Sequence, residues 1–234
     1  SGPQSVNTTL VGLPGFAQVL ALLDLMQRQL GGTLASFEVM WNEYYRLTTT
    51  PPALSKPPLR QDYPFYVLAE TLGGEPDLDR TEFEWALEHG QKTGIFTDAV
   101  IAANAQQRMA LWHVREDSEQ IERQHHLTFG FDVSLPIAEM TAYVETVRGD
   151  LEQHYGPTTC CWVYGHLADG NLHVNVWSPS LQPADRSRVE AIVYTPLRTC
   201  GGSVSAEHGI GLEKKAYLAW SRTAAEIELM KQLK

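Results

Sequence analysis

The stretch Tyr164-Gly165-His166-Leu167-Ala168-Asp169-Gly170-Asn171-Leu172-His173 places two histidines symmetrically about an Asp-Gly dipeptide. Asp-Gly is a strong signal for a two-residue β-hairpin turn of type I′, in which both central residues have positive φ. If Asp169 and Gly170 form this turn, His166 lies directly opposite His173, with Cβ atoms about 4.5–5.5 Å apart. Two imidazoles at that spacing can bind one metal ion. The stretch therefore predicts an antiparallel pair of strands with a metal site beside their turn.

A second segment, Ser205-Ala206-Glu207-His208-Gly209, offers a carboxylate and a third imidazole. One Glu with two His is a common ligand set for catalytic zinc, so His166, His173 and Glu207 are candidate metal ligands. Neighbouring strand residues point to opposite faces, so His208 can share the site only if the chain bends there, which the following glycine permits. His208 would then be the general base. The alternative is a polar turn at a strand end and two structural histidines.

Composition limits the class of protein. The chain has 234 residues, of which 43% are hydrophobic and 20% charged, which is typical of a globular protein of one large or two small domains. The formal net charge of −10, without a Lys/Arg run, argues against nucleic acid and anionic membranes as partners. No apolar run approaches the ~18–20 residues that cross a membrane, so we expect no membrane span.

The cysteines indicate a reducing environment. The chain has three, Cys160, Cys161 and Cys200, and an odd count with two adjacent members is no disulfide framework. We therefore expect a cytoplasmic protein. Cys160 and Cys161 lie in an apolar run, which favours small buried strand residues over metal ligands.

Strand and helix patterns alternate along the chain. Strands are predicted at residues 8–13, 34–40, 65–70, 95–102, 127–135, 158–164, 171–177 and 204–207. Helices are predicted at residues 15–30, 79–92, 104–124, 137–154, 185–199 with an interruption near Pro196, and 212–233, and the proline-rich residues 48–59 are predicted to be irregular. The fold class is α+β: an antiparallel β-sheet flanked by helices, in two ferredoxin-like halves that meet near residues 100–130. No sequence repeat accompanies these halves.

Other polar side chains are candidates for the same site. Arg115, on the predicted helix, can bind a carboxylate through two parallel hydrogen bonds, or it is a solvated arginine of an amphipathic helix. Asn171 and Asn175 flank His173 and can supply the hydrogen bond that fixes a metal-binding imidazole. Asn175 is two residues from His173, which places both side chains on one face of a strand.

Two of these segments resemble a known family. Gly165–His173 and the segment Gly201-Gly202-Ser203-Val204-Ser205-Ala206-Glu207-His208-Gly209-Ile210-Gly211 resemble the signature segments of the C-terminal domain of FAD-linked oxidases. This is the family of D-lactate dehydrogenases, glycolate oxidase and D-2-hydroxyglutarate dehydrogenase. Further similar segments are Ser36–Met40, Phe65–Leu68, Leu111–Glu116 and Asp132–Pro136, and the early ones are most similar to the D-2-hydroxyglutarate dehydrogenase branch.

The resemblance implies that residues 1–234 form the C-terminal, substrate- and metal-binding (cap) domain. The N-terminal flavin-binding domain, which would hold most of the FAD, lies outside this sequence, so the isolated domain should be inactive. The implied ligands of a divalent metal, zinc, are His166, His173 and Glu207. The metal would bind the hydroxyl and a carboxylate oxygen of a small D-2-hydroxyacid, which is oxidised to the 2-oxoacid.

The resemblance also implies roles for the remaining candidates. His208 would remove the hydroxyl proton while the hydride passes to FAD, and Arg115 and Asn175 would orient substrate carboxylates. Gly130 departs from the family, since some relatives carry Lys two residues before the equivalent of Asp132, and this disfavours a substrate resembling 2-hydroxyglutarate. The alternatives are a stand-alone, non-catalytic module that binds metal or acid, and a metal hydrolase. A homodimer is left open.

Overall fold

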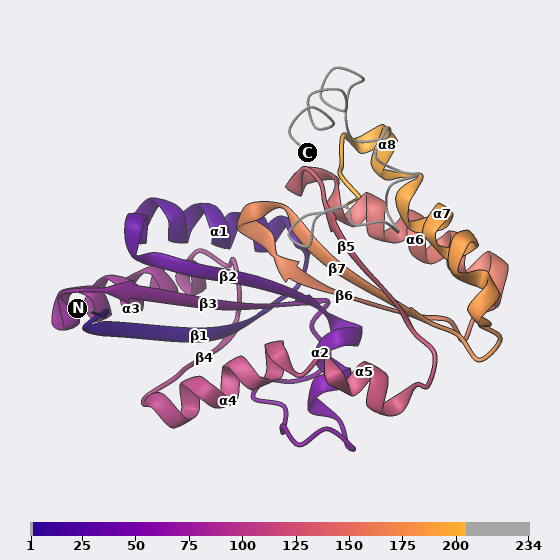
Figure 1. The fold of residues 1–234 in the computed structure, drawn as a ribbon. Helices are drawn as coiled ribbons and strands as arrows, with labels where there is room; N and C mark the ends of the chain where they lie inside the picture. The colour runs from indigo at the N-terminus through magenta and orange to yellow at the C-terminus, as the bar shows by residue number, and fades with distance from the viewer. Residues whose placement is uncertain (1, 205–234) are drawn as a thin grey trace, which may run out of the picture. The chain divides into compact units, whose positions relative to one another are not determined.

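The computed structural model describes residues 2–204, so Glu207, His208 and the elements predicted after residue 204 lie outside the described residues. The chain forms two compact units (Figure 1). Unit 1 comprises Ser1–Gln124 and Tyr164–Ala168, and unit 2 comprises His125–Val163 and Asp169–Lys234. The boundary at residue 124 confirms the prediction that two halves meet near residues 100–130.

Unit 1 has the ferredoxin-like order of elements. Its strands are β1 (Ser5–Leu13), β2 (Leu34–Trp41), β3 (Phe65–Gly73) and β4 (Asp98–Ile101). Its helices are α1 (Phe16–Leu30), α2 (Asn42–Thr49), α3 (Pro76–Lys92), α4 (Ala105–Glu116) and α5 (Glu119–Gln124), with a 3₁₀ turn at Gly31–Thr33. The strands pair antiparallel in the order β4-β1-β3-β2. This order of a β-α-β-β-α-β chain defines the ferredoxin-like arrangement.

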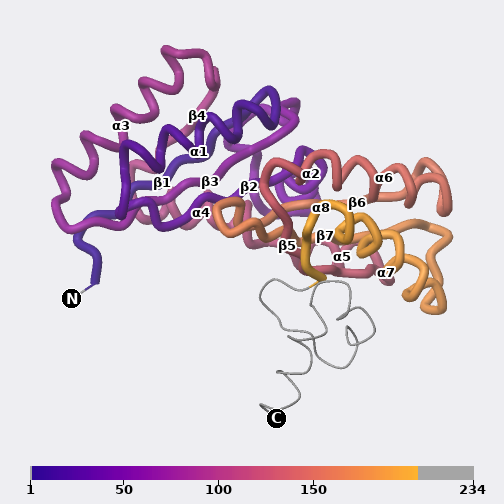
Figure 2. The backbone as a smooth tube through the Cα atoms, turned by 90° about the horizontal axis from the view of Figure 1, so that it is seen from above, coloured from indigo at the N-terminus to yellow at the C-terminus, as the bar shows by residue number. Residues whose placement is uncertain are grey.

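Helices cover both faces of the unit 1 sheet. On one face, Trp41 of β2 contacts the rings of Phe16 at the start of α1 and Phe65 of β3. Figure 2 shows α1 and α3 side by side over this part of the sheet. Residues of β2 alternate between faces, so Glu38 points to the other face, where it meets Arg115 of α4. The face that a minimal ferredoxin-like unit leaves open is thus covered by α2 and α4.

Unit 2 has the same strand order without any sequence repeat. Its strands are β5 (Phe129–Ser134), β6 (Cys160–His166), whose last residues belong to unit 1, and β7 (Asn171–Trp177). Its helices are α6 (Met140–Tyr155), α7 (Arg186–Tyr194) and α8 (Leu197–Cys200), with 3₁₀ turns at Ile137–Glu139 and Pro183–Asp185. The order β6-β7-β5 matches β2-β3-β1 of unit 1. An isolated β-bridge joins Ser134 of β5 to Ser203. Ser203 thus lies beside β5 in the way that β4 lies beside β1 in unit 1.

The structure corrects parts of the predicted secondary structure. The helix predicted at residues 104–124 is two helices, because the chain breaks at Asp117, whose carboxylate accepts a hydrogen bond from Gln120 at 2.8 Å. Helix α2 was missed: Tyr44 and Tyr45 do not favour a helix, but both are fully buried there. The break near Pro196 and the irregular segment that follows Thr49 are confirmed.

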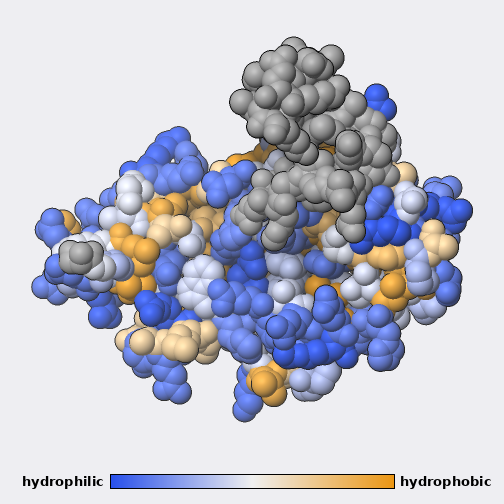
Figure 3. Space-filling model, viewed as in Figure 1, coloured by the Kyte–Doolittle hydropathy of each residue, from blue (hydrophilic) through white to orange (hydrophobic). Residues whose placement is uncertain are grey.

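Apolar side chains on the surface are dispersed. Among residues 2–204, the large exposed apolar side chains are Leu54, Leu72, Leu78, Trp85, Ile101 and Met109. In Figure 3 the visible face is mainly hydrophilic, and its apolar residues form small separate groups. Among the described helices, none is long and apolar enough to cross a membrane.

Candidate functional site

The turn between the two histidines differs from the prediction. Strand β6 ends at His166, and Leu167–Asp169 form a 3₁₀ turn rather than the expected two-residue turn. Only Gly170 adopts positive φ, at 70°, whereas a type I′ turn requires it at Asp169 as well. Leu167 is fully buried, which favours a turn that points this side chain inward. The predicted two-residue turn is therefore wrong, and it no longer supports placing His166 directly opposite His173.

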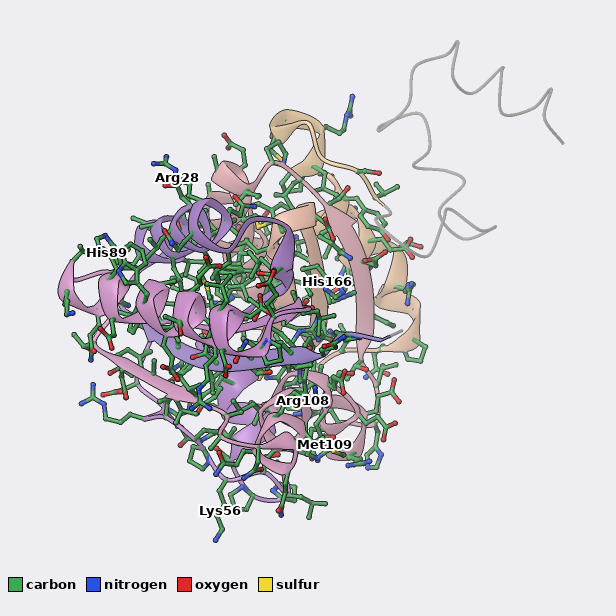
Figure 4. The ribbon with its side chains drawn as sticks, turned by 90° about the vertical axis from the view of Figure 1, so that its left-hand side faces the viewer. Arg28, Lys56, His89, Arg108, Met109 and His166 are labelled. Atoms are coloured by element: carbon green, nitrogen blue, oxygen red, sulfur yellow. The ribbon has the colours of Figure 1, made fainter. Side chains whose placement is uncertain are left out.

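The described partner of His166 is Glu38. The two residues lie directly opposite each other in the antiparallel pair β2–β6. His166 Nδ1 and Glu38 Oε1 are 2.6 Å apart, and Figure 4 labels His166 at the end of its strand. Glu38 is 3% exposed, while 36% of the His166 side chain remains exposed. A buried carboxylate thus contacts one ring nitrogen of a partly exposed imidazole.

The same carboxylate binds Arg115. Nε and Nη2 of Arg115 lie 2.9 and 2.8 Å from Glu38 Oε2, and Arg115 is 7% exposed. The guanidinium lies over the ring of Tyr164, with Cζ 4.6 Å from the centroid, which adds a cation–π contact. Arg115 is therefore the cation of a buried ion pair and not a solvated arginine. A guanidinium has five N–H donors, so the contacts of Nε and Nη2 with Glu38 do not use all of them.

Two tyrosines complete this cluster. The Tyr44 hydroxyl donates to the Arg115 carbonyl at 2.7 Å, and its ring stacks on Tyr164 with centroids 4.0 Å apart. Burial raises the pKa of the Tyr44 hydroxyl well above its usual value, and Tyr164 adds to the shift. Tyr44 therefore stays a neutral donor that fixes the end of α4 against β6 and α2.

Helix α4 contacts the sheet through two strand carboxylates. Trp112 and Arg115 are three residues apart, so they share one side of the helix. Trp112 Nε1 donates to Glu70 of β3 at 2.7 Å, as Arg115 does to Glu38 of β2. Glu70 Oε2 also accepts from Thr8 at 2.6 Å. The position of Arg115 is thus set by the docking of the whole helix.

Unit 2 contains a second carboxylate–histidine pair. Asp132 of β5 lies directly opposite His173 of β7. His173 Nδ1 and Asp132 Oδ1 are 3.6 Å apart, and 18% and 8% of the two side chains are exposed. At this distance the contact is not a well-formed hydrogen bond. Asn175 lies opposite Gly130 on the same face, and a Cβ added to Gly130 would be 3.0 Å from Asn175 Oδ1.

Asn171 does not supply the predicted hydrogen bond to a metal-binding histidine. It is 2% exposed, and within the described part of the chain neither atom of its amide has a hydrogen-bond partner. The carboxylate bound to His166 comes instead from Glu38, which sequence reasoning left without a role. The available signal was an acidic residue inside the apolar run Phe37-Glu38-Val39-Met40, because an unpaired buried charge is costly.

Within residues 2–204, no group of three or more His, Cys, Asp or Glu side chains is arranged to hold a metal ion. Glu207 and His208 lie outside the described residues. The ligand set and the general base therefore stay predictions. The cysteine prediction is confirmed for Cys161, which is buried in β6, and Cys160 is half-buried beside it.

Solved structures define the class of fold. The chain resembles alkyldihydroxyacetonephosphate synthase with a TM-score of 0.63 and 13% identity, over 95% of this chain and 43% of the synthase. It also resembles p-cresol methylhydroxylase with a TM-score of 0.59 and 13% identity, over 86% of this chain and 45% of the other. At these identities the likeness shows the fold alone: an α+β domain with an antiparallel sheet and flanking helices, as predicted.

Sequence comparisons define the family. The profile of "FAD linked oxidases, C-terminal domain" matches residues 2–234. Bovine mitochondrial D-2-hydroxyglutarate dehydrogenase is 36% identical over 99% of this chain and 42% of its own length. D-2-hydroxyglutarate dehydrogenase of Stutzerimonas stutzeri is 31% identical over 99% of this chain and 50% of its own length. The chain belongs to the C-terminal domain family of the FAD-linked oxidases.

The chain spans half or less of these relatives. A putative mitochondrial D-lactate dehydrogenase of Schizosaccharomyces pombe is 31% identical over 99% of this chain and 45% of its own length. The relatives thus carry names of two different hydroxyacid dehydrogenases. Several names also place the relatives in mitochondria, which gives no support to the cytoplasmic location expected from the cysteines.

Proposed function

We propose that this chain is the substrate- and metal-binding domain of a flavin-dependent D-2-hydroxyacid dehydrogenase, which oxidises a D-2-hydroxyacid to the 2-oxoacid. Family membership and the names of the relatives support this class of reaction. The observation that carries the proposal is that both histidines of the signature segment lie opposite an acidic residue of a neighbouring strand. The FAD would be held by the flavin-binding domain of the same enzyme.

The two histidines fit a role as metal ligands. Metal-binding histidines generally direct their second ring nitrogen to a carboxylate or carbonyl group. His166 directs Nδ1 to Glu38 at 2.6 Å, so Nε2 is the nitrogen that would bind metal there. His173 Nδ1 faces Asp132 at 3.6 Å, a looser contact of the same kind. Glu207 is the proposed third ligand. His, His and Glu are ligands that zinc accepts, with a further position for substrate.

The chain's own residues would bind the substrate and hold its proton. A bound metal would supply a Lewis acid that lowers the pKa of the substrate hydroxyl, and FAD would supply a hydride acceptor. Arg115 would use its remaining donors to bind the carboxylate, and Asn175 would orient it by hydrogen bonding. His208 would accept the hydroxyl proton.

The proposal is tested first by metal content. The chain is purified without chelator, soaked in zinc, desalted and measured by plasma mass spectrometry. We expect about one zinc per chain for the wild type, since the site has one set of ligands. His166→Ala and His173→Ala should lose it. His154→Ala is the matched control, because His154 is an exposed histidine of α6. Zinc retained in both ligand variants would contradict the proposal.

The second test is turnover with the flavin-binding domain of the same enzyme, supplied as a separate chain. Flavin bleaching by a D-2-hydroxyacid and not by its L-enantiomer, only when both chains are present, is the expected result. D-lactate should react faster than D-2-hydroxyglutarate, because Gly130 provides no cation for a second carboxylate. Metal-dependent binding of a hydroxyacid without any bleaching would favour a non-catalytic module, and ester cleavage without flavin would favour a hydrolase.

A further inference from the structure

We infer that Glu38 is a positioning residue that sets two functional side chains at once: it fixes the tautomer of His166 for metal binding, and it holds the guanidinium of Arg115. The inference rests on the proposed function for the roles of His166 and Arg115. The contacts that carry it all lie within unit 1. Glu38 itself would touch neither substrate nor metal.

The first step is that Glu38 divides its two oxygens between the two partners. Oε2 accepts from Arg115 Nε at 2.9 Å, with Nη2 at 2.8 Å, while Oε1 lies 2.6 Å from His166 Nδ1. Glu38 is 3% exposed, so water cannot replace either partner without opening the cluster. The side chains of Arg115 and His166 are therefore fixed relative to one carboxylate.

The second step is that this carboxylate selects a tautomer. An ionised carboxylate only accepts hydrogen bonds, and Glu38 forms an ion pair with Arg115 at 2.8 Å. A 2.6 Å contact with Nδ1 requires the hydrogen to be on Nδ1. In neutral imidazole the other nitrogen, Nε2, then carries the lone pair, and this is the nitrogen that a metal needs.

The third step is that an amide in place of Glu38 should reverse the choice. A guanidinium can only donate, so in Glu38→Gln the amide oxygen must stay with Arg115. The amide nitrogen then faces His166 Nδ1 as a donor. This arrangement favours a bare Nδ1 and a hydrogen on Nε2, which blocks metal binding at Nε2. Loss of such supporting contacts typically weakens metal binding about 10–100-fold.

The experiment compares the wild-type chain with Glu38→Gln and with Glu70→Gln as the matched control. Glu70 is another strand carboxylate of unit 1 that binds a side chain of α4, but its described bonds go to Trp112 and Thr8. Long-range ¹H–¹⁵N spectra of the metal-free chain at pH 8 report the His166 tautomer, assigned by comparison with His166→Ala. Zinc affinity is measured by competition with a chelating dye.

The expected result is an Nδ1–H tautomer in the wild type and in Glu70→Gln, and an Nε2–H tautomer with about 10–100-fold weaker zinc binding in Glu38→Gln. An unchanged tautomer in Glu38→Gln would overturn the inference, whatever happens to zinc. A switched tautomer with unchanged zinc affinity would overturn the role of Glu38 toward the metal. A switched tautomer in a chain whose wild type binds no zinc would support the control of His166 by Glu38 and contradict the proposed metal site.

A second variant covers the case in which Glu38→Gln does not fold. Glu38→Asp keeps the negative charge that compensates buried Arg115, so circular dichroism should show a folded chain. Its shorter side chain cannot reach both partners, and the long arginine side chain can follow it more easily than the strand residue His166. We expect weaker zinc binding and a mixed His166 tautomer. Wild-type values for both measurements in Glu38→Asp would overturn the inference.

Discussion

The two units each pair a histidine with a carboxylate from the adjacent strand, but they do so in different surroundings. In unit 1, Glu38 contacts His166 at 2.6 Å and shares its charge with buried Arg115. In unit 2, Asp132 contacts His173 at 3.6 Å, and the next position along the same face of β5 is Gly130. The same cross-strand register thus produces a tight, charge-compensated pair in one half and a looser pair in the other.

This difference indicates how much each pair contributes to the stability of the fold. A guanidinium cannot lose its charge in a protein, so Glu38 is needed to keep Arg115 buried. His173 and Asp132 are 3.6 Å apart, so we expect this contact to stabilise the fold less than the buried ion pair of Glu38 and Arg115 does. We therefore expect Glu38 to have a structural role as well as its proposed positioning role, and Asp132 to contribute less to stability.

The largest expected effect follows from removing these carboxylates. Glu38→Ala leaves a buried arginine without its counter-charge and should reduce the free energy of unfolding by about 3–5 kcal/mol. Asp132→Ala should cost about 1–2 kcal/mol, which is usual for a single substitution. Urea unfolding followed by circular dichroism measures both. Equal losses of unfolding free energy in the two variants would contradict the proposed difference between the Glu38 and Asp132 pairs.

A smaller effect is expected at the turn that leads into β7. Gly170 has φ of +70°, and an added Cβ would lie 2.8 Å from the Leu135 carbonyl oxygen. Gly170→Ala should therefore cost about 1–3 kcal/mol, as for other non-glycine residues in this conformation. Gly149→Ala is the control: Gly149 lies inside α6 with open space around it, so alanine should stabilise the helix by roughly 0.5–1 kcal/mol. Thermal unfolding of the two variants should shift in opposite directions, and parallel shifts would contradict this account of Gly170.

The smallest effect is a pH dependence confined to unit 2. His125 packs against Trp162 and Trp177, with ring centroids 5.0 and 4.1 Å away, and burial lowers its pKa. The unfolded chain, with a His pKa near ~6.5, therefore binds this proton more readily than the folded chain. Stability from His125 is complete above that pH and is lost as the pH falls below it.

His125→Phe tests this dependence, because phenylalanine keeps an aromatic ring between the tryptophans but does not titrate. The free energy of unfolding, measured between pH 7 and pH 5, should fall less steeply with decreasing pH in the variant than in the wild type. An identical slope in both proteins would show that His125 does not contribute.

Much of the fold was predictable because its signals are local. Apolar alternation placed most of the described strands, and Pro196 predicted the break between α7 and α8. The ferredoxin-like halves followed from the order of these elements. The break at Asp117 was not predicted, since the apolar pattern continues across it. The hydrogen bond from the Gln120 side chain to the Asp117 carboxylate forms at the break.

The sequence by itself determined the family, the two-half α+β architecture and the positions of His166, His173, Arg115 and Asn175 on particular strands and helices. Only the tertiary structure decided what these side chains contact. The turn at Leu167–Asp169 depends on burying Leu167, and the partner of His166 comes from a strand 128 residues away in sequence. The local sequence indicates that Glu38 is buried, but it does not identify the partner, because the free energy that selects the pair comes from compensating a buried charge and appears only after the strands have assembled.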